Sequence, residues 1–164
     1  MSCATTWAPL RASKSATSRP IPAPAPVTSD RYQGDWSVAD LGPGDWRYTR
    51  DGAASQALFA AASAPSAILR CSAGQISLIR DALVPADTAA FLTVRTSFGD
   101  RQLPLRPVPG AGARMMGATL PAADPLWDQM LYSRGRFVVE ATRNAPLLLP
   151  TRPELSRVVE DCRG

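Results

Sequence analysis

The sequence predicts a mainly β fold: an antiparallel sandwich or barrel of about eight strands, with one internal and one C-terminal short helix. Three observations lead to this prediction. Beyond Tyr32, turn-forming residues recur between short apolar stretches. Three pairs of these stretches have the spacing of β-hairpins. Only two segments, one internal and one at the C-terminus, have apolar residues at helical spacing.

Composition divides the chain into two parts. Residues 1–30 are rich in Pro, Ala and Ser, with prolines at positions 20, 22, 24 and 26, and they show no helical or strand periodicity. Such a segment buries too little apolar surface to fold by itself, so we expect a disordered, extended tail or tether. Residues 31–164 have the length and composition of a single β-rich globular domain.

Apolar stretches and the turns between them place the strands. Tight turns are expected at three dipeptides: Ala73-Gly74, Gly99-Asp100 and Arg143-Asn144. Leu92, Val94 and Phe98 alternate with polar residues, which predicts one buried and one wet face, and Pro104 indicates an edge strand or a bulge. The predicted strands are residues 45–50, 57–61, 66–72, 75–81, 89–97, 101–107, 113–119 and 136–142, with a further short strand at 146–149.

Each helix is marked by a start signal. Asp124 followed by Pro125 predicts the start of the internal helix, and Gly135 suits its C-terminal end. For the second helix, over residues 152–162, Thr151 and Glu154 match a capping box. Its apolar face is formed by residues at helical spacing: Leu155, Val158, Val159 and Cys162.

Cys71 and Cys162 are predicted to form a disulfide. Cys71 shares a strand face with Leu69, and Cys162 lies on the apolar face of the last helix, so both side chains point towards the core. In the chain-entropy model a bridge closing so long a loop contributes about 4–5 kcal/mol. The alternative is a pair of buried reduced thiols.

Charge and chemistry exclude several classes of function. The net charge of +4 comes from arginines interleaved with acids, which argues against a nucleic-acid partner. The chain has no histidine, so the common nucleophile pairs and most zinc sites are absent from it, and we expect no catalytic residue, no metal and no cofactor. Two carboxylate pairs remain conceivable for a hydrolase: Asp124 with Asp128, and Glu160 with Asp161.

The segment from Asp124 to Phe137 concentrates residue types that dominate binding surfaces. It predicts an interaction surface built from four residues: Trp127, Tyr132, Arg134 and Arg136. The alternative is structural. Trp127 and Phe137 would then belong to the core, and the two arginines would bond helix-end carbonyls or flank the strand. For Arg134 this structural role is the expectation we favour.

Cys3 is a candidate for lipid attachment. The run Ser2-Cys3-Ala4-Thr5-Thr6, followed by a Pro/Ser-rich spacer, resembles the mature N-terminus of a bacterial lipoprotein. That family requires an apolar signal segment upstream, so the resemblance implies such a segment before Met1. A residue other than aspartate after the cysteine implies outer-membrane sorting, and Ala4 fits. The alternative is a free thiol on the tail.

A second resemblance covers residues 45–164. The segment 124–137 carries it, together with Arg95-Thr96-Ser97-Phe98-Gly99 and Val158-Val159-Glu160-Asp161-Cys162-Arg163. These residues resemble a group of small envelope proteins from alphaproteobacteria that has no assigned activity. The resemblance implies export and a shared fold.

We therefore expect a non-catalytic cell-envelope binding or structural domain, tethered through Cys3 in the periplasm or at the outer membrane. Its partner would be an envelope protein or a cell-wall component, and its only membrane contact would be the lipid anchor. The alternatives are a small secreted inhibitor or ligand-binding β-domain, and a carboxylate-based hydrolase.

Overall fold

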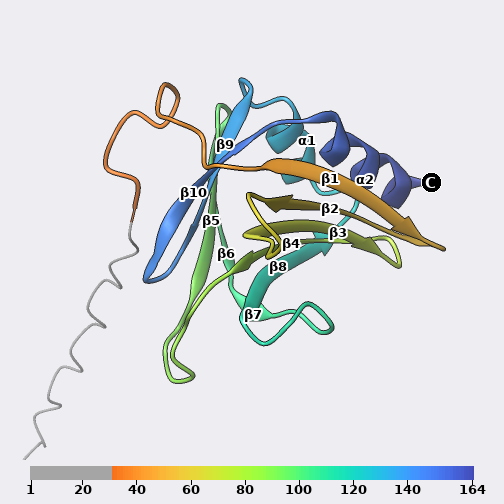
Figure 1. The fold of residues 1–164 in the computed structure, drawn as a ribbon, viewed down its shortest axis with the longest axis horizontal. Helices are drawn as coiled ribbons and strands as arrows, with labels where there is room; N and C mark the ends of the chain where they lie inside the picture. The colour runs from red at the N-terminus through yellow and green to blue at the C-terminus, as the bar shows by residue number, and fades with distance from the viewer. Residues whose placement is uncertain (1–30) are drawn as a thin grey trace, which may run out of the picture.

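A computed structural model describes residues 31–164 and shows two antiparallel sheets accompanied by two helices (Figure 1). The sheets are not closed into a barrel, so the sandwich is the correct one of the two predicted architectures. The predicted tether and the predicted lipid attachment at Cys3 concern residues 1–30, which lie outside the described part of the chain.

The larger sheet has six strands in the order β1-β2-β3-β4-β8-β7. Hairpins join its first four strands, and β8 then pairs with β4 across a long connection. Burial alternates along β2, where Ala57 and Phe59 point into the core. The strands are β1 (Asp45–Asp51), β2 (Ala54–Ala60), β3 (Ala67–Ser72), β4 (Gln75–Asp81), β7 (Arg106–Pro107) and β8 (Met115–Pro121).

The smaller sheet has four strands in the order β10-β9-β5-β6, so β6 and β10 are its edges. Its centre is apolar: Val94 lies opposite Val139, and both are fully buried. The strands are β5 (Phe91–Thr96), β6 (Gly99–Pro104), β9 (Arg136–Ala141) and β10 (Asn144–Pro150).

Three predictions about these strands are wrong in detail. The expected turn at Arg143-Asn144 lies one residue earlier, since Ala141 pairs directly with Asn144. The expected strand 101–107 divides, because β6 ends at Pro104 in the small sheet while Arg106–Pro107 pairs with β8 in the large one. The expected turn at Gly99-Asp100 lies two residues earlier, since Thr96 pairs directly with Gly99. Pro104 stands on an edge strand, as predicted.

Helix α1 (Pro125–Leu131) starts as predicted, because the Asp124 side chain accepts a hydrogen bond from the Leu126 amide at 2.9 Å. Helix α2 (Pro153–Arg163) has its N-cap at Arg152, with no side-chain cap. The predicted capping box is therefore wrong. The Thr151 hydroxyl instead donates to the carbonyl of Met130 at 3.3 Å and fastens the start of α2 to the end of α1.

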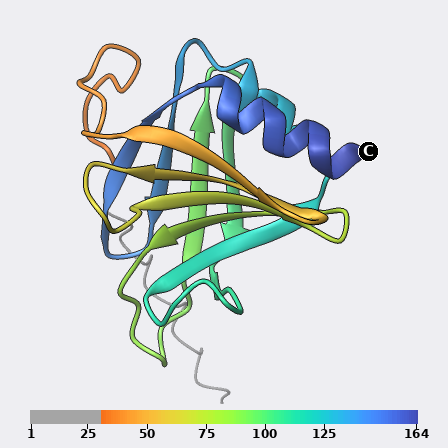
Figure 2. The same ribbon diagram turned by 45° about the vertical axis from the view of Figure 1, so that its right-hand side comes forward.

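Helix α2 packs along the inner side of the large sheet, with α1 beside it (Figure 2). Its residues Leu155, Val158 and Val159 are buried in the same apolar cluster as the inward side chains of both sheets. The helix therefore covers core that the second sheet leaves uncovered. Neither helix in residues 31–164 is long and apolar enough to cross a membrane.

Residues 31–39 cover part of the outer face of the small sheet. The Tyr32 amide donates to Glu140 Oε1 at 3.0 Å, and an Arg136 guanidinium N–H donates to the carbonyl of Ala39. Glu140 is 1% exposed and also receives Arg95 Nη1 at 3.3 Å. The first residues of the domain are thus held by a buried charge, which is costly to leave unpaired.

Candidate interaction surface

Three segments distant in sequence meet at one end of the small sheet: residues 36–39, the β5–β6 turn and the α1–β9 loop. The buried Ser133 holds the last two together, because its Oγ accepts from the Ser97 amide at 3.1 Å and donates to the carbonyl of Arg136 at 2.5 Å. Arg136 in turn bonds the carbonyl of Ala39. The three segments are therefore fixed relative to one another before any partner binds.

The side chains presented there form what we call the end surface, defined as Trp36, Ser97, Phe98, Tyr132, Arg134 and Arg136. Phe98 is 61% exposed and Tyr132 is 73% exposed, which is unusual for large aromatic residues. The other four residues, with Ser37, line a hollow of about 340 Å³. Three aromatic residues and two arginines have the composition of a binding hot spot.

The two arginines have different roles. Arg134 is exposed and forms no hydrogen bond or ion pair with residues 31–164. The structural role expected for Arg134 is therefore wrong, because it occupies the loop after the helix end with its side chain in solvent. Arg136 is half-buried and takes the structural role by bonding the carbonyl of Ala39.

Trp127 does not belong to the end surface. Its side chain is fully buried, and its Nε1 donates to the carbonyl of Pro121 at 2.9 Å. The sequence also placed Phe98 in the core, by extending the alternation of Leu92 and Val94. The strand ends at Thr96, however, and Phe98 occupies the turn that follows. Trp36 was missed, because only the fold brings its segment here.

Charge on the end surface favours an anionic partner. The nearest acid in sequence is Asp35, whose Oδ1 accepts from the Ser37 hydroxyl at 2.6 Å and from the Ser37 amide at 2.9 Å. These side-chain and backbone bonds lower the pKa of Asp35. The guanidinium of Arg134, which forms no hydrogen bond or ion pair with residues 31–164, is available for a carboxylate or phosphate.

The first candidate carboxylate pair is already engaged. Asp124 receives both Nη atoms of Arg101, at 2.5 and 3.0 Å. Partial burial by itself would raise the pKa of Asp124, but the hydrogen bonds from Arg101 and from the Leu126 amide outweigh it and leave the pKa lowered. Asp128 pairs with Arg163 Nη1 at 2.9 Å. A general acid needs a raised pKa, so this environment favours a structural role.

The second pair includes Asp161, which lies beside the disulfide. The Tyr48 hydroxyl donates to Asp161 Oδ2 at 2.6 Å, and Arg50 Nη1 lies 3.0 Å from Oδ1. The hydrogen bond from Tyr48 lowers the pKa of Asp161. It also raises the pKa of Tyr48. These contacts fasten the end of α2 to the edge strand β1.

Cys71 and Cys162 are bonded, with their Cα atoms 5.5 Å apart. Cys71 is buried on the inner face of β3, and Cys162 is on the last turn of α2. The bridge therefore joins the C-terminal helix covalently to the centre of the large sheet, as the sequence predicts. The loop that it closes spans 91 positions.

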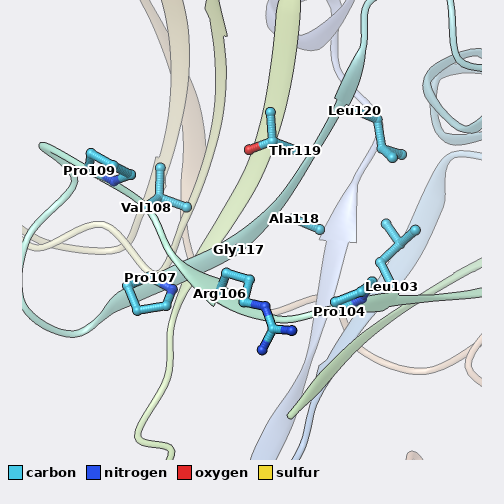
Figure 3. A pocket seen from close by; sticks show the side chains of 10 residues that line it. All are labelled: Leu103, Pro104, Arg106, Pro107, Val108, Pro109, Gly117, Ala118, Thr119 and Leu120. Atoms are coloured by element: carbon cyan, nitrogen blue, oxygen red, sulfur yellow. The ribbon is translucent and has the colours of Figure 1, made fainter. Parts of the chain in front are cut away.

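A larger hollow, of about 400 Å³, lies where β6 passes into β7 beside β8 (Figure 3). Its wall is largely apolar, with Leu103, Pro104 and Leu120 on one side, Pro107, Val108 and Pro109 on the other, and the Arg106 side chain between them. In the described part of the chain, no group of three or more Cys, Asp or Glu side chains is placed to hold a metal ion. Comparisons of this chain with protein families, curated proteins and solved structures gave no match.

Proposed function

We propose that this chain is a non-catalytic binding or structural domain of the bacterial cell envelope, held to a membrane through Cys3. The observation that carries the proposal is the bond between Cys71 and Cys162. Disulfides of this kind form and persist in oxidising compartments such as the bacterial periplasm, and they are rare in the cytosol. The bond therefore supports export.

The proposed location is the periplasm or the outer membrane, with a signal segment encoded upstream of Met1. The resemblance of Ser2-Cys3-Ala4 to a lipoprotein N-terminus supports a lipid on Cys3, and Ala4 supports outer-membrane sorting. The Pro-rich residues that follow provide reach between a membrane and the domain. Residues 45–164 also resemble small alphaproteobacterial envelope proteins, which agrees with this location.

The proposed partner is an envelope protein or cell-wall component that presents acidic groups to the end surface. Exposed Tyr132 and Phe98 offer aromatic contact area, and Arg134 offers an unoccupied guanidinium. A second candidate is a secreted ligand-binding β-domain without a lipid, which the apolar hollow beside Leu103 and Leu120 favours. The hydrolase has less support, because Asp124, Asp128 and Asp161 are engaged by arginines.

The location is tested with the gene expressed together with its own upstream in-frame sequence. Cells fed a clickable fatty acid should label the protein, and Cys3→Ser should lose the label while the matched variant Ser2→Ala keeps it. Membrane fractionation should follow the same pattern. A wild-type protein that stays unlabelled and cytosolic contradicts the proposal.

The binding role is tested with purified cell-wall sacculi and with cross-linking in cells. Arg134→Ala and Tyr132→Ala should each reduce sedimentation with sacculi or the yield of one cross-linked partner. Arg143→Ala serves as the control, because Arg143 is an exposed arginine in the β9–β10 turn, outside the end surface. A loss in Arg143→Ala as large as that in Arg134→Ala would indicate non-specific charge attraction and contradict a role for the end surface.

A further inference from the structure

The hollow of about 400 Å³ beside β6 and β8 lies at an open seam between the two sheets (Figure 3). The seam is open because β6 is an edge of the small sheet and β7, an edge of the large sheet, has only two residues. Strand β7 pairs with Met116 and Gly117 alone, so no strand of residues 31–164 continues along the rest of β8 on that side. We call this space the seam hollow. Its volume falls within the range of small-molecule pockets, ~300–1,000 Å³.

The walls of the seam hollow are apolar and held in place by the fold. Leu103 and Leu120 belong to one wall, and Val108 belongs to the other. Between the two sheets the chain passes through Leu105, which is buried and continues the ladder with its amide. Three of the lining residues are prolines: Pro104, Pro107 and Pro109. Because proline restricts the backbone, a ligand meets a surface that is already formed and loses little affinity to ordering of the protein.

Arg106 supplies the charge of the seam hollow. Among residues 31–164 it is the only charged residue of the lining, and its side chain lies between the two walls. This side chain is exposed and forms no hydrogen bond or ion pair with residues 31–164. The hydroxyl of Thr119, also in the lining, is shared with the Ser77 hydroxyl at 2.7 Å. The head group of a ligand therefore meets one uncompensated guanidinium.

The acidic residues nearby in the sequence are already paired with other arginines. On β6, Asp100 lies 2.8 Å from Arg31 and 3.4 Å from Arg95. After β8, Asp124 is paired with Arg101. No carboxylate lines the seam hollow within the described part of the chain. An anion that enters it is therefore attracted by a positive charge without a competing acid.

We propose that the seam hollow binds a single-chain aliphatic carboxylate, with the carboxylate on Arg106 and the hydrocarbon chain between the two walls. A guanidinium pairs with a carboxylate through two parallel N–H···O bonds. The chain covers apolar surface of Leu103, Val108 and Leu120, so its affinity increases with the area that it covers. The site is separate from Cys3 and from the end surface. Loss of lipid labelling or of sacculus binding therefore has no bearing on it.

The test is an NMR titration of the full chain of residues 1–164 with hexanoate, octanoate and decanoate, each below its micelle concentration. The amide signals of Leu103, Ala118 and Leu120 should shift saturably, with one carboxylate bound per chain. Each two added methylenes should tighten binding roughly fourfold, the change expected when about half of each methylene is covered. Octyl glucoside, which has a neutral head group on the chain of octanoate, should bind at least about tenfold more weakly than octanoate.

Two kinds of variant separate the head group from the chain. Arg106→Ala should weaken all three carboxylates by one common factor of about tenfold at low salt, and this factor should shrink as salt is raised. Leu120→Ala should weaken decanoate more than hexanoate, because the longer chain covers more of the wall. Val108→Ala takes its place if the NMR spectrum shows Leu120→Ala to be unfolded. Arg47→Ala is the matched control, since Arg47 is an exposed arginine on β1, at the opposite edge of the large sheet, and it should leave binding unchanged.

Four results would overturn the proposal. The first is the absence of saturable shifts with decanoate. The second is equal binding of octyl glucoside and octanoate, since the charge of the head group would then play no part. The third is a loss in Arg47→Ala as large as that in Arg106→Ala, which would indicate non-specific charge attraction. The fourth is binding to vesicles of anionic phospholipid without binding of free decanoate, since the seam hollow would then contact a membrane surface.

Discussion

Arg80 Nη1, on β4 of the large sheet, donates to the carbonyl of Val139 on β9 of the small sheet at 2.9 Å. Its Nη2 donates to the carbonyl of Ala145 at 2.9 Å, where a register shift in β10 leaves that carbonyl outside the ladder. Arg80 is 4% exposed. Burial lowers its pKa to about 10, so it remains charged at neutral pH. One buried cation thus links the two sheets.

Replacing Arg80 should destabilise the fold more than its single charge implies. Arg80→Met removes a buried hydrogen bond to the carbonyl of Val139 and a partly buried one to the carbonyl of Ala145, and we expect the free energy of unfolding to fall by about 2–4 kcal/mol. Arg80→Lys keeps the charge but cannot reach both carbonyls, so its loss should be smaller. Urea denaturation at pH 7 measures both. Arg114→Met, at an exposed ion pair with Asp81, is the control and should cost less than about 1 kcal/mol. If Arg80→Met and Arg114→Met lowered the free energy of unfolding equally, Arg80 would not link the two sheets as described.

Local patterns predicted the elements correctly where one short segment contains the whole signal. Asp124 and Pro125 placed the start of α1, and the alternation around Cys71 placed it in the core. The inward orientation of Arg80 could also be predicted from the sequence, because Arg80 continues the face of the strand that carries Ile76 and Leu78. Its hydrogen-bond partners could not be predicted, since they lie in the other sheet, where β10 has a register shift. Strand pairing between distant segments leaves little trace in one sequence.

The end surface shows the same division. Residue type alone predicts Tyr132 and Arg134 on this surface, and both are exposed. Residue type also predicts Trp127 there, but Trp127 is buried, because its position on the helix face decides its exposure and its residue type does not. Trp36 joins the surface from almost a hundred residues away. The hydrogen bond from Arg136 to the carbonyl of Ala39 holds the segment that contains Trp36 against the start of β9.

Breaking the disulfide should cost about 4–5 kcal/mol, because the loop between Cys71 and Cys162 spans 91 positions. We expect Cys71→Ser and Cys162→Ser to shift urea unfolding equally, and the double variant to lose no more than either single one. Cys3→Ser should unfold like the unchanged chain. Non-reducing peptide mass spectrometry should recover one linked pair. A linked peptide that contains Cys3 would contradict the assignment.

The exposed and buried members of the predicted surface should separate sharply in stability. Tyr132→Ala and Arg134→Ala should change the free energy of unfolding by less than about 0.5 kcal/mol. Trp127→Ala should lower it by about 3–5 kcal/mol, because it empties a fully buried site and removes one of the two hydrogen bonds to the carbonyl of Pro121, which keeps the bond from the Asp124 amide. Thermal unfolding of the three variants checks the order. A large loss of unfolding free energy in Arg134→Ala would show that Arg134 has a structural role after all.

Gly117 is required by the close approach of β4 and β8. A Cβ at this position would lie 2.3 Å from the carbonyl oxygen of Leu78 and 2.9 Å from Ile79 Cα, both backbone atoms. Gly117→Ala must therefore move one strand away from the other, and we expect a loss of about 1–3 kcal/mol in urea unfolding. Thr119→Ala, on the exposed side of the same strand, is the control. A neutral Gly117→Ala would show that the strands move apart without cost.

Acid should weaken the attachment of α2 to β1. The hydrogen bond from Tyr48 to Asp161 lowers the pKa of Asp161 in the folded protein relative to the unfolded chain. Between these two values the unfolded chain binds more protons, so stability falls as pH falls. The contribution of Asp161 is complete above about pH 5 and is lost as pH drops through its folded-state pKa.

The matching variant is Asp161→Asn, measured by urea unfolding from pH 7 to pH 3. Its deficit relative to the unchanged chain should be largest near pH 7 and should shrink on acidification, because the carboxyl that it replaces is neutralised there anyway. Asp87→Asn, at an exposed loop position, should show no such convergence. Tyr48→Phe should reproduce part of the effect, since it removes the hydroxyl that bonds Asp161. A deficit that stays constant with pH would mean that Asp161 acts by packing and not by its charge.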